Sequence, residues 1–238
     1  MRLALISDVH GNATALRAVL ADMAGERVER IISLGDAVSS GPQPEEVLQL
    51  LAENRVELVI GNTEQRLLHP ISPEGQSEHV VMLMEIEAWI RQTVPGDVLD
   101  RLRNAKQTID VQLGENLHLL CCHGSPRSAN ERLVAELSDE ELERTFIGSR
   151  FDLLAAGHTH IQMLRNYRSR RLLNPGTVGS AIGMGPVAQY ALLSASSGRV
   201  DVSFRSVPYD ITPAVEAAKR FGMPHAEWWV NNWLVKAN

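Results

Sequence analysis

The sequence has few cysteines, no cluster of basic residues and no long apolar run, and each shortage excludes a class of protein. Only two of the 238 residues are cysteines, the adjacent Cys121 and Cys122. Neighbouring side chains of a strand point to opposite faces, so a disulfide between these two would be badly strained. The chain is therefore not a disulfide scaffold, and we expect two buried thiols in a reducing compartment.

No segment approaches the roughly 20 apolar residues that a membrane-spanning helix needs. The first apolar run, Leu3 to Ile6, is too short for the core of a secretory signal peptide. Lysine and arginine total 23 against 29 aspartate and glutamate residues, which gives a net charge of −6, and no segment gathers the basic residues. We therefore expect a cytoplasmic protein that neither enters a membrane nor binds nucleic acid in general.

The remaining composition, 44% hydrophobic and 22% charged, is that of a folded globular protein. The chain has no internal repeat and no low-complexity segment. We interpret residues 1–238 as a single domain with a helical insertion at about 63–104 and a helical C-terminal tail at about 211–238. Trp228, Trp229 and Trp233 favour packing of this tail on its own domain, and a homodimer formed through the tail is the alternative.

Short apolar runs rich in β-branched residues alternate with segments of helical period in the first part of the chain. Runs that indicate buried strands are Leu3 to Ser7, Ile31 to Leu34 and Val56 to Ile60. Between them, Ala13 to Met23 and Pro44 to Glu53 have the spacing of helices. This order predicts a largely parallel α/β arrangement.

The second half returns to strand-like runs, interrupted by a stretch from Ala129 to Ile147 that we predict to be helical. Its later runs follow one another as a meander, with a hairpin turn at Ser196-Ser197-Gly198. The whole chain therefore predicts an α/β fold in which two mixed β-sheets face each other and helices flank them.

Five predicted core strands end in residue types that bind metal ions. Their ends are Asp8-Val9-His10, Gly35-Asp36, Gly61-Asn62, His123-Gly124 and Gly157-His158-Thr159-His160. The carboxyl ends of parallel strands line one crevice, so we expect these loops to converge. Each motif alone is weak, because Gly-Asp by itself is more often a turn. If no metal were bound, all five motifs would have to occur after apolar runs by coincidence. We therefore predict a metal site.

The chemistry of these residues indicates phosphoester hydrolysis. Imidazole and carboxylate ligands together suit transition metals such as Mn²⁺, Fe²⁺ or Zn²⁺. Seven such ligands are too many for one ion and enough for two. Two ions about 3.5–4 Å apart present a shared water as hydroxide and clamp the oxygens of a phosphate during in-line displacement.

In this order the motifs resemble the signature of the calcineurin-like metallophosphoesterases, over residues 8–160. Three longer segments are similar to the small prokaryotic branch of that family, whose members are phosphodiesterases or phosphatases: Asp8-Val9-His10-Gly11-Asn12, His123-Gly124-Ser125-Pro126-Arg127 and Asn174-Pro175-Gly176-Thr177. The resemblance implies an α/β/β/α sandwich. Asn174-Pro175-Gly176 would lie beside the site, either as a simple turn or as a phosphate contact.

The resemblance also implies a role for each residue. One ion would be bound by Asp8, His10 and His160, the other by Asn62, His123 and His158, with Asp36 between them. A hydroxide that bridges the ions would attack phosphorus, and Asp36, Asn62 and His123 are the predicted catalytic residues. Asn12 and Arg127 are predicted to contact substrate, Arg127 through its planar guanidinium. The cofactors would be two of Mn, Fe, Zn or Ni, with Mn favoured.

One residue departs from the wider family, in which a histidine proposed to help the leaving group follows the asparagine. Here the segment reads Gly61-Asn62-Thr63-Glu64, and the hydroxyl of Thr63 is too weakly acidic to replace an imidazole. We therefore predict a small phosphodiester substrate. The alternatives are a phosphatase acting on phosphoproteins or dinucleoside polyphosphates, and a weakly catalytic scaffold that binds a protein.

Overall fold

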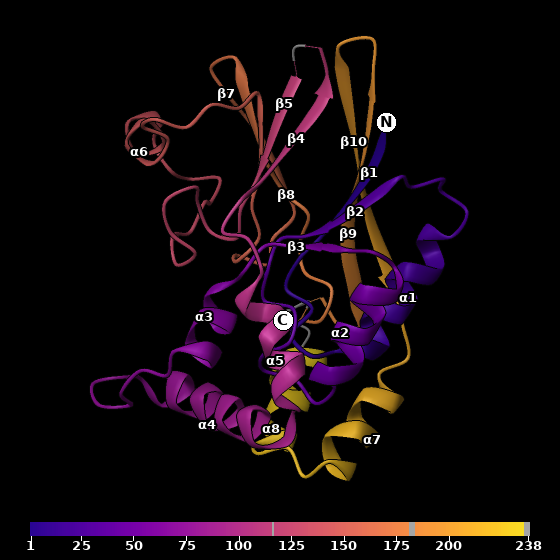
Figure 1. The fold of residues 1–238 in the computed structure, drawn as a ribbon, viewed down its shortest axis with the longest axis vertical. Helices are drawn as coiled ribbons and strands as arrows, with labels where there is room; N and C mark the ends of the chain where they lie inside the picture. Colours follow the sequence, from indigo (N-terminus) through magenta and orange to yellow (C-terminus); the bar gives the residue numbers. More distant parts are fainter. Residues whose placement is uncertain (116, 181–183, 236–238) are drawn as a thin grey trace.

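Two five-stranded sheets face each other, and helices lie outside them (Figure 1). The computed structural model describes residues 1–115, 117–180 and 184–235. The first sheet has the strand order β10-β9-β1-β2-β3 and the second the order β4-β5-β6-β8-β7. This architecture confirms the predicted α/β fold of two mixed sheets flanked by helices.

In the first sheet, β1, β2 and β3 are parallel, and β9 and β10 join antiparallel on the other side of β1. The strands span β1 (Arg2–Ile6), β2 (Arg30–Ser33), β3 (Glu57–Leu58), β9 (Val187–Ser196) and β10 (Arg199–Pro208). Helices α1 (Ala13–Met23) and α2 (Pro44–Glu53) connect the parallel strands. These two helices have the predicted bounds.

In the second sheet, β5, β6 and β8 are parallel, and β4 and β7 are antiparallel strands at its two edges. The strands span β4 (Ile109–Gly114), β5 (Leu117–Cys121), β6 (Leu153–Ala155), β7 (Met163–Tyr167) and β8 (Arg170–Asn174). Helix α6 (Asp139–Thr145) packs on the outer face of this sheet through Leu142.

Alternating side chains explain why each sheet has two buried faces. On β1, Leu3 and Leu5 enter the core between the sheets, whereas Ala4 and Ile6 face the helices. The cysteines at the end of β5 behave likewise, with Cys121 between the sheets and Cys122 in the core beneath α6. Both thiols are free and buried, as predicted.

Helices α3 (Asn62–Leu68), α4 (Glu78–Thr93) and α5 (Gly96–Arg103) lie in the region predicted as a helical insertion. The tail contains α7 (Thr212–Arg220), α8 (Ala226–Trp229) and a π-helical turn at Val230–Val235. Trp229 and Trp233 are buried in the core of the first sheet and its helices, which confirms the predicted packing. The end of the predicted tail, 236–238, lies outside the described residues. Among the described helices, none is both long and apolar enough to cross a membrane.

The prediction of a helical stretch from Ala129 to Ile147 is confirmed for α6, which begins after its cap Ser138, and is wrong for the residues before it. The preceding carbonyl groups are bonded elsewhere. Arg165 reaches over from β7 and donates from Nη1 to the carbonyl oxygens of Ala135 and Leu137, at 3.1 and 2.6 Å. A contact from a distant strand thus replaces the local hydrogen bonds that the sequence period suggests.

Candidate metal centre

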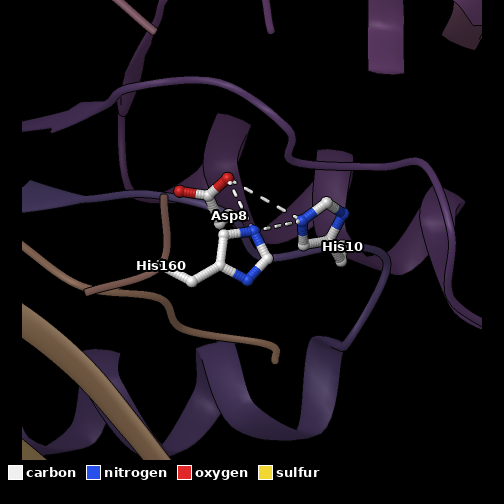
Figure 2. Close-up of side chains that lie close together, drawn as sticks. All are labelled: Asp8, His10 and His160. Carbon is white, nitrogen blue, oxygen red and sulfur yellow. Dashed lines mark hydrogen bonds and ion pairs between the residues drawn. The ribbon is translucent and has the colours of Figure 1, made fainter. Parts of the chain in front are cut away.

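The loops that follow β1, β2, β3, β5 and β6 meet at the carboxyl ends of the strands, as the sequence predicts. Two groups of side chains could each hold a metal ion: Asp8, His10 and His160 form the first, and Asp36, His123 and His158 the second. Within each group, the ligand atoms lie within 4.8 Å of one another. Figure 2 shows the first group, in which Asp8 and both imidazoles turn toward one point. Residues up to 152 positions apart in the chain, Asp8 and His160, thus form one cluster.

The first group is compact, and two of its three members are buried. The Nε2 atom of His160 lies 3.2 Å from Asp8 Oδ1 and 3.1 Å from the Nε2 atom of His10. The Nε2 atom of His10 lies 3.7 Å from the same carboxylate oxygen. Asp8 is fully buried and His10 nearly so.

The second group contains the predicted asparagine. The Nε2 atom of His123 lies 2.9 Å from Asn62 Oδ1 and 3.4 Å from Asp36 Oδ2. The imidazole rings of His123 and His158 have centroids 5.2 Å apart. The outer members of this group, Asn62 and His158, are half-buried, so the centre is open on their side.

Asp36 lies between the two groups. Its Oδ2 atom is 3.4 Å from His123 Nε2 and 3.9 Å from His10 Nε2. Its other oxygen, Oδ1, accepts a hydrogen bond from the backbone N–H of Thr63 at 3.0 Å, which fixes the carboxylate. A single oxygen of Asp36 therefore faces both groups of donors.

Backbone carbonyls orient three of the imidazoles. Nδ1 of His10 faces the carbonyl of Ser39 at 3.2 Å, that of His123 the carbonyl of Leu34 at 2.7 Å and that of His160 the carbonyl of Ser180 at 3.3 Å. A carbonyl oxygen only accepts, so each Nδ1 carries a proton and donates it. Each ring is thereby held with Nε2 directed into the centre, the arrangement that metal-bound histidines show.

The donor set fits cations. The Nε2 atoms of His10 and His160 lie 3.1 Å apart. If both carry lone pairs, they repel each other, and a cation bound between them would remove the repulsion. His123 Nε2 likewise faces the amide oxygen of Asn62, at 2.9 Å, so a proton or a cation has to lie between these two atoms. Asp8 Oδ1 is buried and has no hydrogen-bond donor. Buried acceptors gathered without donors are costly, and two divalent cations would satisfy them.

The pKa values of the buried carboxylates and imidazoles agree with a site that binds cations. Burial alone would raise the pKa of Asp36, but the facing His123 imidazole outweighs it, and the pKa lies well below its ordinary value. Burial also tends to lower the pKa of His123, which the Asp36 carboxylate more than offsets, raising it to about 10. Burial lowers the pKa of His10 to about 4. The carboxylates stay ionised, and they require a proton or a metal ion beside them.

The backbone adopts rare conformations at these positions. Five of the seven predicted ligands have left-handed φ angles, from 49° to 65°: Asp8, His10, Asp36, His158 and His160. Each such residue costs on the order of 1–3 kcal/mol, and such strain is concentrated at functional sites. The loops also need small neighbours, because a Cβ at Gly61 would overlap Asp36 Oδ1.

The two residues predicted to contact substrate, Asn12 and Arg127, both form hydrogen bonds within the protein. Asn12 is fully buried and caps α1 through the N–H of Ala15, while its amide donates to the Gly179 carbonyl and the Tyr209 hydroxyl. Arg127 pairs with Glu131 and donates to the carbonyl of Arg144. Their contacts with substrate stay predictions, and the observed bonds support the loops after β1 and β5.

Glu64 is a supporting residue that the sequence reading passed over. It is fully buried and accepts hydrogen bonds from the backbone N–H groups of Asp36, Val38 and Gly61, at 2.8, 3.0 and 3.0 Å. Burial and the nearby Asp36 carboxylate raise its pKa to about 7. The signal was present, since an acid three residues after Gly61 is a capping pattern for α3.

Two further residues surround the centre. Asn174 donates to the carbonyl of Gly157 at 2.7 Å and accepts from the N–H of Gly176 at 2.9 Å. The predicted turn therefore holds the loop that bears His158. Trp233 of the tail lies edge-on to His10, with ring centroids 4.8 Å apart. No local sequence pattern predicts this contact, because it joins residues near opposite ends of the chain.

The sandwich fold and the paired donor groups define a metallophosphoesterase type of centre. A family model, the calcineurin-like phosphoesterase superfamily domain, matches residues 1–198. The match spans most of the chain, and the protein belongs to this superfamily. The resemblance found in the sequence is thereby confirmed, and with it a hydrolase of the phosphoesterase class.

Known proteins and solved structures are similar to this chain over nearly its whole length. The structure of a metallophosphoesterase from Sphaerobacter thermophilus is 27% identical, with a TM-score of 0.73 and coverage of 95% of this chain and 96% of that one. The structure of the hypothetical protein PH1004 from Pyrococcus horikoshii shares the fold at 19% identity, with a TM-score of 0.81 and 99% coverage of both chains. The uncharacterized protein MJ0912 from Methanocaldococcus jannaschii is 24% identical over 243 residues, which cover 95% of this chain and 94% of the relative.

Proposed function

We propose that the protein is a two-metal phosphodiesterase that hydrolyses small phosphodiesters. The position of Asp36 is the main support, because one of its oxygens lies within 4 Å of an imidazole in each donor group. A residue so placed suits a ligand shared by two ions. A protein that used this fold only as a scaffold would have no physical need for the complete donor set.

Residues of this chain would bind both metal ions. Asp8, His10 and His160 would bind one ion, Asn62, His123 and His158 the other, and Asp36 both, with Mn²⁺ favoured by the mixed ligands. Bound divalent ions would act there as Lewis acids toward a phosphate and lower the pKa of bound water. Thr63 fixes Asp36 through its backbone, and the carbonyls of Leu34, Ser39 and Ser180 orient the imidazoles.

A comparison of two substrates tests this function. Protein stripped with a chelator and given Mn²⁺ is assayed on bis-p-nitrophenyl phosphate, a diester, and on p-nitrophenyl phosphate, a monoester. We expect no turnover without metal, and faster turnover of the diester once Mn²⁺ is present. Faster turnover of the monoester would contradict the diester preference. Metal-independent turnover would contradict the metal centre.

The preference for diesters follows from Thr63, whose side chain is buried beside Asp36. A hydroxyl cannot protonate a leaving group near neutral pH, so substrates with strongly basic leaving groups should react slowly. We expect Thr63→His to raise monoesterase relative to diesterase activity by at least about tenfold, since a placed general acid contributes about 10²–10⁴-fold. Initial rates on the same two substrates measure the ratio.

The control for this variant is Thr63→Ala, which removes the hydroxyl and adds no imidazole. Thermal denaturation of both variants shows whether the larger ring is accommodated in the fold. A folded Thr63→His protein with the wild-type ratio would contradict the role assigned to this position.

A further inference from the structure

A cavity of about 710 Å³ adjoins the open side of the metal centre, and Asn62 is one of its lining residues. The other walls come from α3 and the loops on either side of it, from the end of α5 and the segment that links it to β4, and from Asn130 in the loop after β5. Pockets that enclose small organic ligands have volumes of about 300–1,000 Å³. The cavity is therefore large enough for a substituent of the substrate as well as for the phosphate.

The lining combines carboxamides with apolar side chains. Gln65, Gln107 and Asn130 contribute amides, and Gln65 donates to Gln107 at 3.3 Å, so these two lie side by side. A carboxamide both donates and accepts, and this pairing matches the edge of a nucleobase. Ile60 and Ile71 offer apolar surface to the faces of such a ring.

The charges of the cavity favour an uncharged substituent. Arg66 donates from Nε to both oxygens of the buried Glu87, at 3.0 and 2.9 Å. Arg103 pairs with Asp100. The pair of Arg103 and Asp100 is exposed and weak, whereas Arg66 is already held by a buried carboxylate, and a second phosphate would have to compete for it. A polyphosphate chain fits this lining less well than a nucleoside does.

The opposite side of the centre is covered by the tail. Trp233, only 7% exposed, lies with its ring centroid 4.8 Å from that of His10 and 6.4 Å from that of His160. Asn62, His158 and His160 are half-buried, and Asn62 also lines the cavity. A phosphoester therefore has access to the centre from the side of Asn62, where the cavity lies.

We propose that this cavity binds the uncharged nucleoside substituent of a nucleotide phosphodiester, while the reacting phosphate lies beside Asn62. The proposal rests on the phosphodiesterase function proposed above, because it names the substrate class of the same centre. Gln65 and Gln107 would determine specificity through hydrogen bonds to the base.

Two substrates with the same leaving group test the proposal: the p-nitrophenyl ester of thymidine 5′-monophosphate and methyl p-nitrophenyl phosphate. Ile71, at 48% exposure, tolerates a larger side chain, and Ile71→Trp would fill the cavity. We expect Ile71→Trp to raise KM for the thymidine ester by about tenfold or more, which is the size of effect that lost contacts in a binding pocket have. Gln107→Leu should raise the same KM. The kcat/KM for the methyl ester should stay within about twofold of wild type in both variants.

The matched control is Ile147→Trp, which adds the same ring at an exposed position, 77% exposed, outside the cavity. It should leave both substrates unaffected. Equal losses on both esters in Ile71→Trp, or no loss on either, would overturn the proposal.

A binding measurement separates this proposal from the proposed activity, because it requires no turnover. Thymidine and the four ribonucleosides are titrated against the wild-type protein, Ile71→Trp and Ile147→Trp, and followed by ligand-observed NMR. Binding to the wild type and to Ile147→Trp that is lost in Ile71→Trp supports the cavity even if no ester is hydrolysed. Hydrolysis of both esters with no nucleoside bound, and with no effect of Ile71→Trp, overturns the cavity and leaves the phosphodiesterase standing.

Discussion

Asp36→Asn is expected to lose about 1,000-fold or more in diester hydrolysis, since the metal ions supply several kcal/mol of transition-state stabilisation. The substitution keeps the size of the side chain and an oxygen to accept from the N–H of Thr63. It removes the negative charge from the atom that faces His10 and His123. An amide cannot serve two cations as a carboxylate does, so the metal content should fall from two ions per chain.

Metal content by mass spectrometry and turnover of bis-p-nitrophenyl phosphate, both measured at saturating Mn²⁺, check this prediction. The matched control is Asp201→Asn, which makes the same change at an exposed position of β10. It should retain both ions and full turnover. An Asp36→Asn protein that kept two ions and the wild-type rate would contradict the shared role of this carboxylate.

Glu64→Ala is expected to lower the free energy of unfolding by about 3 kcal/mol or more, because each buried N–H left without a partner costs about 1–3 kcal/mol. Three such groups, those of Asp36, Val38 and Gly61, bond to this carboxylate. For a chain of this length the melting temperature should fall by about 6–12 °C. Since all three groups lie in the loops that present Asp36 and Asn62, metal affinity should fall as well.

Calorimetric unfolding, with and without Mn²⁺, measures this effect. Glu64→Gln keeps one acceptor oxygen and should lose less stability than Glu64→Ala. Glu216→Ala removes an exposed carboxylate from α7 and should shift the melting temperature by about 1 °C or less, as surface substitutions do. A Glu64→Ala protein as stable as this control would show that the three backbone groups find other partners.

The sequence determined the order of strands and helices because these depend on local patterns. The helices at Ala13–Met23 and Pro44–Glu53 were predicted with the bounds observed. The ligand types could also be read from the sequence, since each follows a buried apolar run. Parallel strands direct their carboxyl ends to one edge of their own sheet, which accounts for Asp8, Asp36 and Asn62 after β1, β2 and β3. His160 follows β6 of the second sheet, and the packing of the two sheets brings it to Asp8.

Local patterns failed where distant contacts decided the outcome. The stretch from Ala129 has a helical period, yet Arg165 of β7 bonds its carbonyls and holds it as a loop. The pairing of Arg127 with Glu131 is another contact that the sequence pattern does not show, and the predicted contact of Arg127 with substrate stays a prediction. Side chains of this length choose partners in space, which spacing along the chain does not reveal.

The sequence by itself therefore determined the fold class, the superfamily and the types of residue in the candidate metal centre. Tertiary structure alone decided which oxygen of Asp36 faces both donor groups, which carbonyls orient His10, His123 and His160, and that Trp233 covers one side. The physical reason is range. Periodicity, capping and turn chemistry act over a few residues, whereas these contacts join segments up to 223 residues apart, from His10 to Trp233, and depend on how the two sheets pack.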